Sequence, residues 1–360
     1  MAVTTVSDLT SALNLPFNLR WLQEYSTQNS ALYRSGIISR DPDIQNVVTQ
    51  SSAQSKTGTL DFFKDLAGDD AALSQTDPIV PDKMTGAKDT YVIHRRGKAW
   101  SAHDLAGILS GAGDVVQQAM TLIGDFQVRA RQKMLMRTLK GVFASNLANN
   151  SGDLVFDMTG LQAPYLDTYS LLDAAQLLGD AKGLLTALVC HSAVELQLNK
   201  LGAKSQTYQP ADERTGVLAR YNGKSIIMDD DLPYNPQTGV TEFYLFAQGA
   251  VAEASAVPTA NFPAFERYRE ELKSTSGIIA RDAYVMHVRG IKYVGSTDAD
   301  SPADATIENA ASWSRVYEKK HIRVIKVVCK VGNLGGTPSG GGSSGASSGA
   351  SGASSGATSN

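Results

Sequence analysis

The sequence contains few of the residues that mark a secreted, membrane or redox protein. Its 360 residues include two cysteines, Cys190 and Cys329, and each lies in an apolar run. We therefore expect two buried thiols in a reducing compartment and no disulfide framework. No apolar run approaches the roughly 18 residues of a membrane span. The first residues lack the basic and apolar parts of a signal peptide, so we expect neither a signal peptide nor a membrane span.

The chain also has no large excess of charge of either sign. Its net charge is −3, with 42% hydrophobic and 19% charged residues, which is ordinary for a globular protein. A dedicated nucleic-acid-binding protein would have a basic surface patch and a high isoelectric point. We therefore expect nucleic acid at most as a non-specific neighbour.

Patterns for catalysis and metal binding are missing as well. Cys190 and His191 are adjacent on a predicted strand and would point to opposite faces, so they do not suit a nucleophile and base. Asp229, Asp230 and Asp231 follow a predicted strand and could hold Mg²⁺ beside a substrate phosphate, but no matching carboxylate or histidine cluster lies nearby. There is no phosphate-binding glycine loop and no nucleophile elbow. We expect no catalytic residue, cofactor or metal site; an α/β enzyme using the Asp229–Asp231 loop remains the enzymatic alternative.

What the sequence does contain is a helical pattern of unusual length, from Asp114 to Ala148. These 35 residues include no proline, and their apolar positions recur at helical spacing. Such a helix would span roughly 50 Å, about three times a typical globular helix, and needs something to lie against along its whole length. The two apolar tracks consist of Val115, Ala119, Leu122, Phe126, Ala130 and Met134, and of Leu135, Leu139, Val142, Phe143 and Leu147.

A long excursion precedes this helix. Two strand-like runs, Thr59–Phe63 and Thr90–Arg95, flank about 26 residues rich in Asp, Gly, Pro and Ser. An isolated two-stranded hairpin is marginal in water, so we expect the excursion to pack on another chain. The basic cluster at its base, His94–Arg96 with Lys98, could contact phosphate, although an intersubunit ion pair suits a protruding element better. A short helix is expected from Ser101 to about Leu109.

The rest of the chain predicts an α/β middle followed by a β-rich part. The middle is expected to hold helices at Tyr169–Lys182 and Ser192–Leu201, and strands at Leu184–His191, Lys224–Met228 and Thr241–Ala247. The β-rich part is expected to hold strands at Phe265–Leu272 and Ile278–Val288, with Ile291–Val294 continuing their sheet and Ile322–Val331 returning to it as the final strand.

The two ends of the chain show no core of their own. Residues 1–50, with a short helix expected at Leu19–Gln28, are interpreted as an extended, unsupported arm that needs another subunit to pack on. Residues 335–360 are nearly all Gly, Ser, Ala and Thr, which predicts disorder.

Several stretches, taken in order, resemble the Gp13-like family of major capsid proteins of tailed bacteriophages, which share the HK97 fold. None of them is a catalytic motif. They are Arg96–Trp100 (RGKAW), His103–Gly111 (HDLAGILSG), Leu139–Ala144 (LKGVFA), His191–Ser192, Ile226–Asp231 (IIMDDD), Tyr244–Ala250 (YLFAQGA) and His287–Gly290 (HVRG). The likeness in element order covers roughly residues 1–331.

The resemblance implies an α+β, HK97-like capsid fold with a long spine helix, an extended E-loop, a peripheral (P) domain sheet and an α/β axial (A) domain. It places the N-terminal arm at 1–50, the E-loop at 51–96 and the A-domain at 161–261. The P-domain would comprise 97–160 and 262–331, with the spine helix at about 114–148. A disordered Gly/Ser-rich tail would follow at 332–360.

The resemblance also implies a structural, non-enzymatic role. The expected function is a subunit of an icosahedral bacteriophage head, which assembles into hexamers and pentamers around double-stranded DNA. Its expected partners are copies of itself, with scaffolding, portal and decoration proteins as further candidates and no membrane. The expected location is the virion, after assembly in the host bacterial cytoplasm. The candidate intersubunit contacts are Phe62, Phe63, Arg95, Arg96, Trp100, Asp229, Asp230 and Asp231.

The alternative that shares this fold is an encapsulin-like shell, a bacterial nanocompartment around a cargo enzyme. The sequence alone leaves this alternative open, because both kinds of shell would use the same elements. Nucleic acid inside purified particles would distinguish the two.

Overall fold

The computed structural model describes residues 35–51, 56–66, 68, 83–103, 115–167, 169–205, 208–210, 219–256, 263–270, 275–296 and 300–332. The helix predicted at Leu19–Gln28, the predicted N-cap Asp114 and the tail from 333 onward lie outside these residues. Within the described ranges, no helix is long and apolar enough to cross a membrane.

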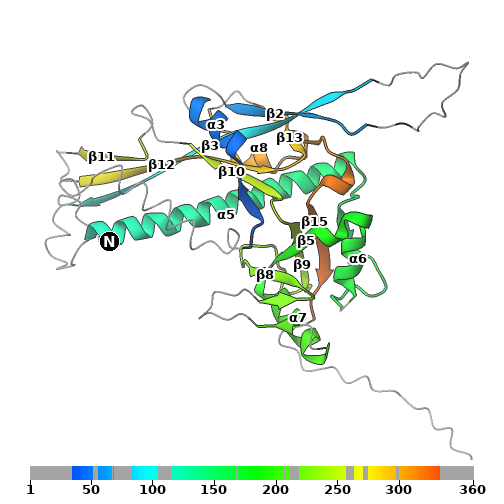
Figure 1. The fold of residues 1–360 in the computed structure, drawn as a ribbon. Coiled ribbons are helices and arrows are strands. Elements are labelled where there is room, and N and C mark those ends of the chain that lie inside the picture. Colours follow the sequence, from blue (N-terminus) through cyan, green and yellow to red (C-terminus); the bar gives the residue numbers. More distant parts are fainter. Residues whose placement is uncertain are drawn as a thin grey trace, which may run out of the picture.

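The longest element is helix α5, Val115–Asn149, which confirms the predicted 35-residue helix with its ends one residue later. We refer to it as the spine helix. Figure 1 shows it running along one sheet and ending beside the other. Its buried residues include Met134, Leu135, Leu139, Val142 and Phe143, so the half near its C-terminus is anchored in the core.

Two of the predicted apolar positions on α5 do not face the core. Leu122 and Leu147 are each 67% exposed. One residue turns a helix by about 100°, so Leu122 lies more than a quarter turn from buried Ile123. By the same geometry, Leu147 lies about 80° from Leu139, two turns earlier. The predicted tracks wind around the helix, and only the parts that meet the sheets are buried.

The first sheet has six strands in the order β1-β10-β12-β3-β2, with β11 also paired to β12. Strands β3 and β12 pair antiparallel from Ile93 opposite Val285 to His103 opposite Thr275. The helix predicted from Ser101 is therefore wrong at residues 101–103, because pairing with β12 extends the strand there; residues 104–109 lie outside the described ranges. The strands are Ile38–Arg40 (β1), Thr57–Phe63 (β2), Gly86–His103 (β3), Val251–Ser255 (β10), Phe265–Glu270 (β11) and Thr275–Val288 (β12).

Residues 35–51 pack on their own chain. Strand β1 runs parallel to β10, and helix α3, Pro42–Ser51, follows it. Ile37, Ile44 and Val48 are fully buried. The expectation that the arm needs another subunit is wrong for these residues, because both their backbone pairing and their apolar contacts come from the same subunit.

The second sheet has seven strands in the order β4-β15-β9-β5-β8-β7-β6. Strand β15 lies parallel to β4 and antiparallel to β9. The final strand therefore belongs to the α/β sheet and not to the β-rich part as predicted. Its side chains Val324, Ile325 and Val327 are fully buried, which suits a strand covered on both faces. The strands are Val155–Asp157 (β4), Leu185–Cys190 (β5), Tyr208–Gln209 (β6), Arg220–Tyr221 (β7), Lys224–Met228 (β8), Val240–Ala247 (β9) and Val324–Lys330 (β15).

Two further local predictions differ from the structure. The single helix expected at Tyr169–Lys182 is divided into α6, Ser170–Gln176, and a 3-10 helix, η2, at Gly179–Leu184. Gly179 has φ +60°, a left-handed conformation that ends an α-helix. Strand β13, Ile291–Tyr293, was expected to continue the preceding sheet but pairs instead with β14, Trp313–Arg315. Within the described ranges, the other helices are α7 (Ser192–Ser205), α8 (Asp304–Glu308), η4 (Ala310–Ser312) and η5 (Lys319–His321).

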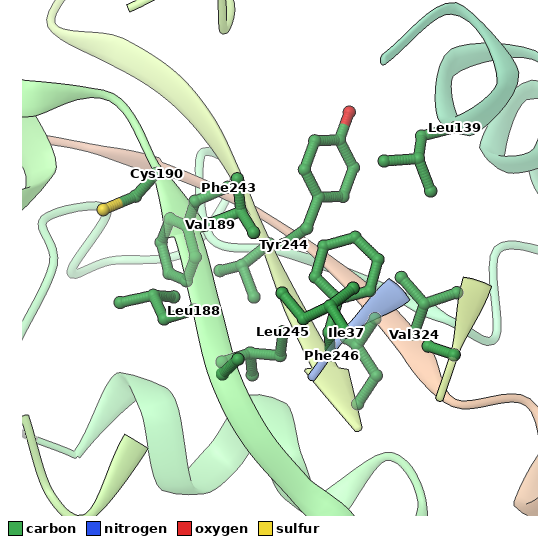
Figure 2. Close-up of a cluster of buried hydrophobic side chains, with 14 of the residues drawn as sticks. Ile37, Leu139, Leu188, Val189, Cys190, Phe243, Tyr244, Leu245, Phe246 and Val324 are labelled. Atoms are coloured by element: carbon green, nitrogen blue, oxygen red, sulfur yellow. The ribbon is translucent and has the colours of Figure 1, made fainter. Parts of the chain in front are cut away.

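One hydrophobic core joins the spine helix to the seven-stranded sheet. Figure 2 shows side chains of β5 and β9 packed together with residues from α5, β15 and the start of the described chain. The ring of Phe143 on α5 also stacks on Tyr244 with centroids 5.5 Å apart. The labelled members of this cluster are Ile37, Leu139, Leu188, Val189, Cys190, Phe243, Tyr244, Leu245, Phe246 and Val324.

A glycine allows the C-terminal half of α5 to approach the segment around α8 and β14. The indole Nε1 of Trp313 donates a hydrogen bond to the carbonyl oxygen of Ile307 (2.7 Å). A Cβ atom on Gly141 would lie 2.1 Å from that oxygen and 2.6 Å from the indole nitrogen. This close contact therefore requires the absence of a side chain.

We predict that Gly141→Ala destabilises the protein by about 1–3 kcal/mol, because the added methyl group overpacks this contact. In an exposed helix the same replacement would stabilise the protein by about 1 kcal/mol, because alanine favours the helix more than glycine does. The direction of the change in stability therefore tests the packing. The matched control is Gly183→Ala, where a Cβ would meet no atom within 4 Å. Urea unfolding would measure both variants, and a stabilised Gly141→Ala would contradict the packing assigned to this site.

Candidate assembly interface

The β2–β3 hairpin extends beyond the sheet that supports it. Residues Thr57–Phe63 pair with Val92–Gly86, whereas β12 pairs with β3 only from Ile93 onward. Figure 1 shows the paired strands leading to the open end of the hairpin. An isolated two-stranded ribbon is only marginally stable in water, so this part of the chain depends on packing against other residues for its stability. On its own chain, Phe62 contacts Tyr317 edge-on with ring centroids 4.7 Å apart.

Large apolar side chains gather at the end of this hairpin without cover. Phe63, Leu66 and Met84 are 78%, 74% and 65% exposed. Beside them, a groove of about 700 Å³ separates the hairpin end from Leu184 and the segment around Tyr317. An exposed apolar group next to a groove is typical of an interaction site.

The predicted contact residues Arg95 and Arg96 already have partners within the chain. The Arg95 guanidinium donates to the carbonyl oxygen of Asp300 (3.0 Å), and that of Arg96 donates to Pro302 (2.9 Å). Arg96 also lies 3.0 Å from the carboxylate of Asp304. These bonds hold the 300–304 segment on β3; a further role between subunits stays a prediction for both arginines.

His94, the first member of the predicted basic cluster, is completely buried. Alternation along β3 places it on the opposite face from Arg95, and its ring lies 5.6 Å from that of Tyr284. Burial, and secondarily the charge of Arg96, lowers the pKa of His94 from 6.5 to about 3. It is therefore neutral in the folded chain and is no phosphate contact.

The Asp229–Asp231 loop serves local structure. The backbone N–H of Asp231 donates to the Asp229 side chain (3.0 Å), and the N–H of Ser192 donates to the Asp230 carboxylate (3.1 Å). Hydrogen bonding from Ser192 lowers the pKa of Asp230. Asp231 lies 3.7 Å from the ammonium group of Lys133 on α5. The loop thus holds the start of α7 and faces the spine helix; within the described ranges, no group of three potential metal ligands comes together.

Cys190 and His191 do not form a catalytic pair. Cys190 is fully buried, and burial raises the pKa of its thiol well above the ordinary value. His191 uses Nδ1 to accept a hydrogen bond from the backbone N–H of Ala193 (3.0 Å) at the start of α7.

Sequence reasoning missed a polar contact with two carboxylates, which centres on Arg131 of α5. Its guanidinium donates two bonds of 2.9 Å to Asp282 and one of 2.8 Å to Glu253. It also lies over the ring of Tyr284, 4.9 Å from the centroid. Glu253 is only 2% exposed, so this contact fastens the spine helix to β10 and β12. Five basic residues crowd this part of the sequence, and nothing in their spacing marks Arg131 as the one that pairs with a buried carboxylate.

The chain matches one protein family over most of its length. Residues 108–322 match the family described as Gp13-like, major capsid protein 13-like. The major capsid protein of Bacillus phage SPP1 is 32% identical over 332 residues, which is 91% of this chain and 98% of that protein. The chain belongs to the Gp13-like family of phage major capsid proteins.

Solved structures support the fold of this capsid protein. The capsid asymmetric unit of cyanophage Pam1 superposes with a TM-score of 0.51 at 12% identity, covering 85% of this chain and 93% of that one. The SrpI encapsulin of Synechococcus elongatus covers 70% of this chain at a TM-score of 0.44, which is too low to carry an argument. The α+β, HK97-like capsid fold expected from the sequence is confirmed, and the family is one of structural shell proteins built from many copies.

The Arg131 contact makes a stability prediction for this capsid protein. Arg131→Met leaves Glu253 buried without its cation and should destabilise the subunit by about 3–5 kcal/mol. The control is Arg129→Met, two residues away and exposed, which should change stability by less than about 0.5 kcal/mol. Urea unfolding of the unassembled subunit would measure the stability of both variants. An equal loss of stability in the two would show that burial of Glu253 does not require the positive charge of Arg131.

His94 makes a prediction about pH. Because its pKa is about 3 in the folded chain and 6.5 in the unfolded chain, only the unfolded chain binds a proton between these values. Its contribution to stability is fully present above pH 6.5 and decreases as the pH falls, by about 2 kcal/mol at pH 5. His94→Leu should remove this part of the pH dependence, which unfolding curves at pH 8 and pH 5 would measure. An unchanged difference between the two pH values would contradict the assignment.

Proposed function

We propose that this major capsid protein forms the wall of an icosahedral phage head, as hexamers and pentamers that enclose double-stranded DNA after assembly in the host bacterial cytoplasm. Its family membership and near-neutral charge support a shell that encloses DNA without binding it tightly. Scaffolding, portal and decoration proteins are the candidate partners besides other copies of the chain. Particles from infected cells should contain nuclease-protected DNA, whereas an encapsulin-like shell would contain a protein cargo.

The proposed domains follow the two sheets. The six-stranded sheet and the spine helix form the P-domain, and the seven-stranded sheet forms the A-domain. Because β4 and β15 pair within the seven-stranded sheet, we assign both to the A-domain, which moves its proposed boundaries away from 161 and 261. The β2–β3 hairpin with residues 64–85 is the E-loop.

The observation that carries the assembly proposal is the uncovered apolar end of this hairpin. A side chain such as Phe63, which projects from a two-stranded ribbon, has little own-chain surface to lie on. In a shell, a neighbouring subunit supplies that surface, and burial of a phenylalanine side chain contributes about 1.5–3 kcal/mol per contact. The E-loop therefore lies over an adjacent subunit and links the copies of the chain.

We predict that Phe63→Ser leaves the subunit folded but strongly reduces the yield of shells. The matched control is Asp61→Ser, which changes an exposed residue on the same face of β2 and should assemble normally. Replacement of residues 64–85 by a short Gly-Ser linker should abolish assembly. Circular dichroism would check folding, and sedimentation with negative-stain microscopy would count particles. Wild-type yields from both Phe63→Ser and the linker variant would rule out the overlap.

A further inference from the structure

The β2–β3 hairpin leaves the subunit at a point where the six-stranded sheet divides. Strand β3 pairs with β12 only as far as Ile93 opposite Val285, and nearer the open end of the hairpin it pairs with β2 alone. Backbone pairing there joins the two hairpin strands to each other but not to the rest of the sheet. We call residues 60–63 of β2 and 86–89 of β3 the hairpin arm.

The base of the hairpin arm carries a buried carboxylate, that of Asp89. Tyr91, two residues nearer the sheet, is buried in an apolar cluster, whereas none of the described residues 83–88 toward the open end is buried. Asp89 is 2% exposed, and its Oδ2 accepts a hydrogen bond from the backbone N–H of Gly290 (3.0 Å). The same oxygen lies 3.0 Å from Nε2 of His287, which is also 2% exposed. A side-chain contact therefore crosses the division where the backbone pairing has ended.

The turn that receives Asp89, between β12 and β13, is itself fixed from the other side. Gly290 has φ +86°, a left-handed conformation that favours glycine. Its carbonyl oxygen accepts hydrogen bonds from the N–H groups of Val316 (2.9 Å) and Tyr317 (3.2 Å). A Cβ atom on Gly290 would lie 2.5 Å from the ring of Tyr317, so the turn and this ring are in close contact. Asp89 is thus offered a donor in one definite place.

The second strand of the hairpin arm is held at the same turn. Phe62 of β2 meets the ring of Tyr317 edge-on, and it pairs with Ala87, two residues from Asp89 along β3. The groove of about 700 Å³ beside the hairpin lies between Phe62 and Phe63 on one side and the segment around Tyr317 on the other. The direction of the arm therefore sets the width of this groove.

The two contacts of the arm differ in what they can specify. The contact of Phe62 with Tyr317 is apolar, and apolar attraction has little directional preference. The hydrogen bond of Asp89 is directional, because it weakens steeply when donor and acceptor are misaligned. In the described part of the chain no lysine or arginine lies within ion-pair distance of Asp89, and Arg289 beside it pairs with Asp41 at 2.8 Å. Moving the arm would leave a buried carboxylate without its partners, which is costly.

We propose that Asp89 is the positioning residue of the hairpin arm, and that its bond to Gly290 fixes the direction in which the arm leaves the subunit. Without this bond the two strands of the hairpin stay paired, but the arm moves relative to Tyr317 and the groove changes width. In the shell proposed above, this direction decides where Phe63 is presented. The inference itself concerns the isolated subunit, so its test does not depend on the shell function.

A distance measurement on the unassembled, full-length subunit tests this role. Both native cysteines are buried, so spin labels on Lys64→Cys and Lys320→Cys report the distance across the groove that these two residues line. The distribution of distances should be narrow when Asp89 is present and should broaden in Asp89→Val. Asp89→Asn keeps an oxygen for the Gly290 N–H and should stay narrow, as should the control Lys88→Ala at an exposed neighbour. A narrow distribution for Asp89→Val would overturn the proposal.

Hydrogen exchange separates positioning from a general loss of stability. In Asp89→Val the amides of the hairpin arm should exchange at least about tenfold faster, as expected for the loss of one hydrogen bond, while those of α5 keep their wild-type rates. Equal acceleration in the arm and in α5 would mean that Asp89 only stabilises the fold, and would overturn the proposal. If Asp89→Val does not fold, Asp89→Ser, whose oxygen lies one atom closer to the backbone, takes its place in both measurements with the same expected results.

Discussion

The contact between Arg131 and the pair Glu253 and Asp282 fixes the spine helix against the six-stranded sheet. A helix of this length cannot be held by its end alone, and its apolar residues are concentrated in the core near the C-terminal half. Arg131 supplies the anchor midway, where the guanidinium satisfies two carboxylates and covers the Tyr284 ring. Because Glu253 is almost completely buried, the carboxylate and the arginine must stay together for the fold to persist.

The spine helix contacts both sheets: it runs along the six-stranded sheet and ends beside the seven-stranded sheet (Figure 1). The C-terminal half shares one core with the seven-stranded sheet, and Gly141 leaves room for the Trp313 ring and the Ile307 carbonyl group to lie close against the helix. Closer to the N-terminus of the helix, Phe126 packs edge-on against Trp100 of β3. One helix thus contacts both sheets and joins them into one subunit.

The polar residues divide into those that finish the subunit and those that remain available. Asp230 caps α7, Arg96 holds the 300–304 segment, and His94 is buried without charge, so all three have a role within the subunit. In contrast, the apolar side chains of Phe63, Leu66 and Met84 at the hairpin end remain exposed in the subunit. This division agrees with a family whose members act as building blocks, where unused surface on one copy is matched by another.

The sequence by itself determined the features that depend on local spacing. Helix α5, strands β5, β8, β9 and β12 and the resemblance to phage capsid proteins could all be derived from it, because each is carried by a run of neighbouring residues. Only the tertiary structure decided which sheet receives β15, that Ser101–His103 extend β3, and that the arm from 35 to 51 packs on its own chain. It also decided that Arg131, among several similar basic residues, is the one that pairs with buried Glu253, and that Leu122 and Leu147 face outward. Strand pairing and burial join residues far apart in the chain, and no local pattern records which distant partner will be met.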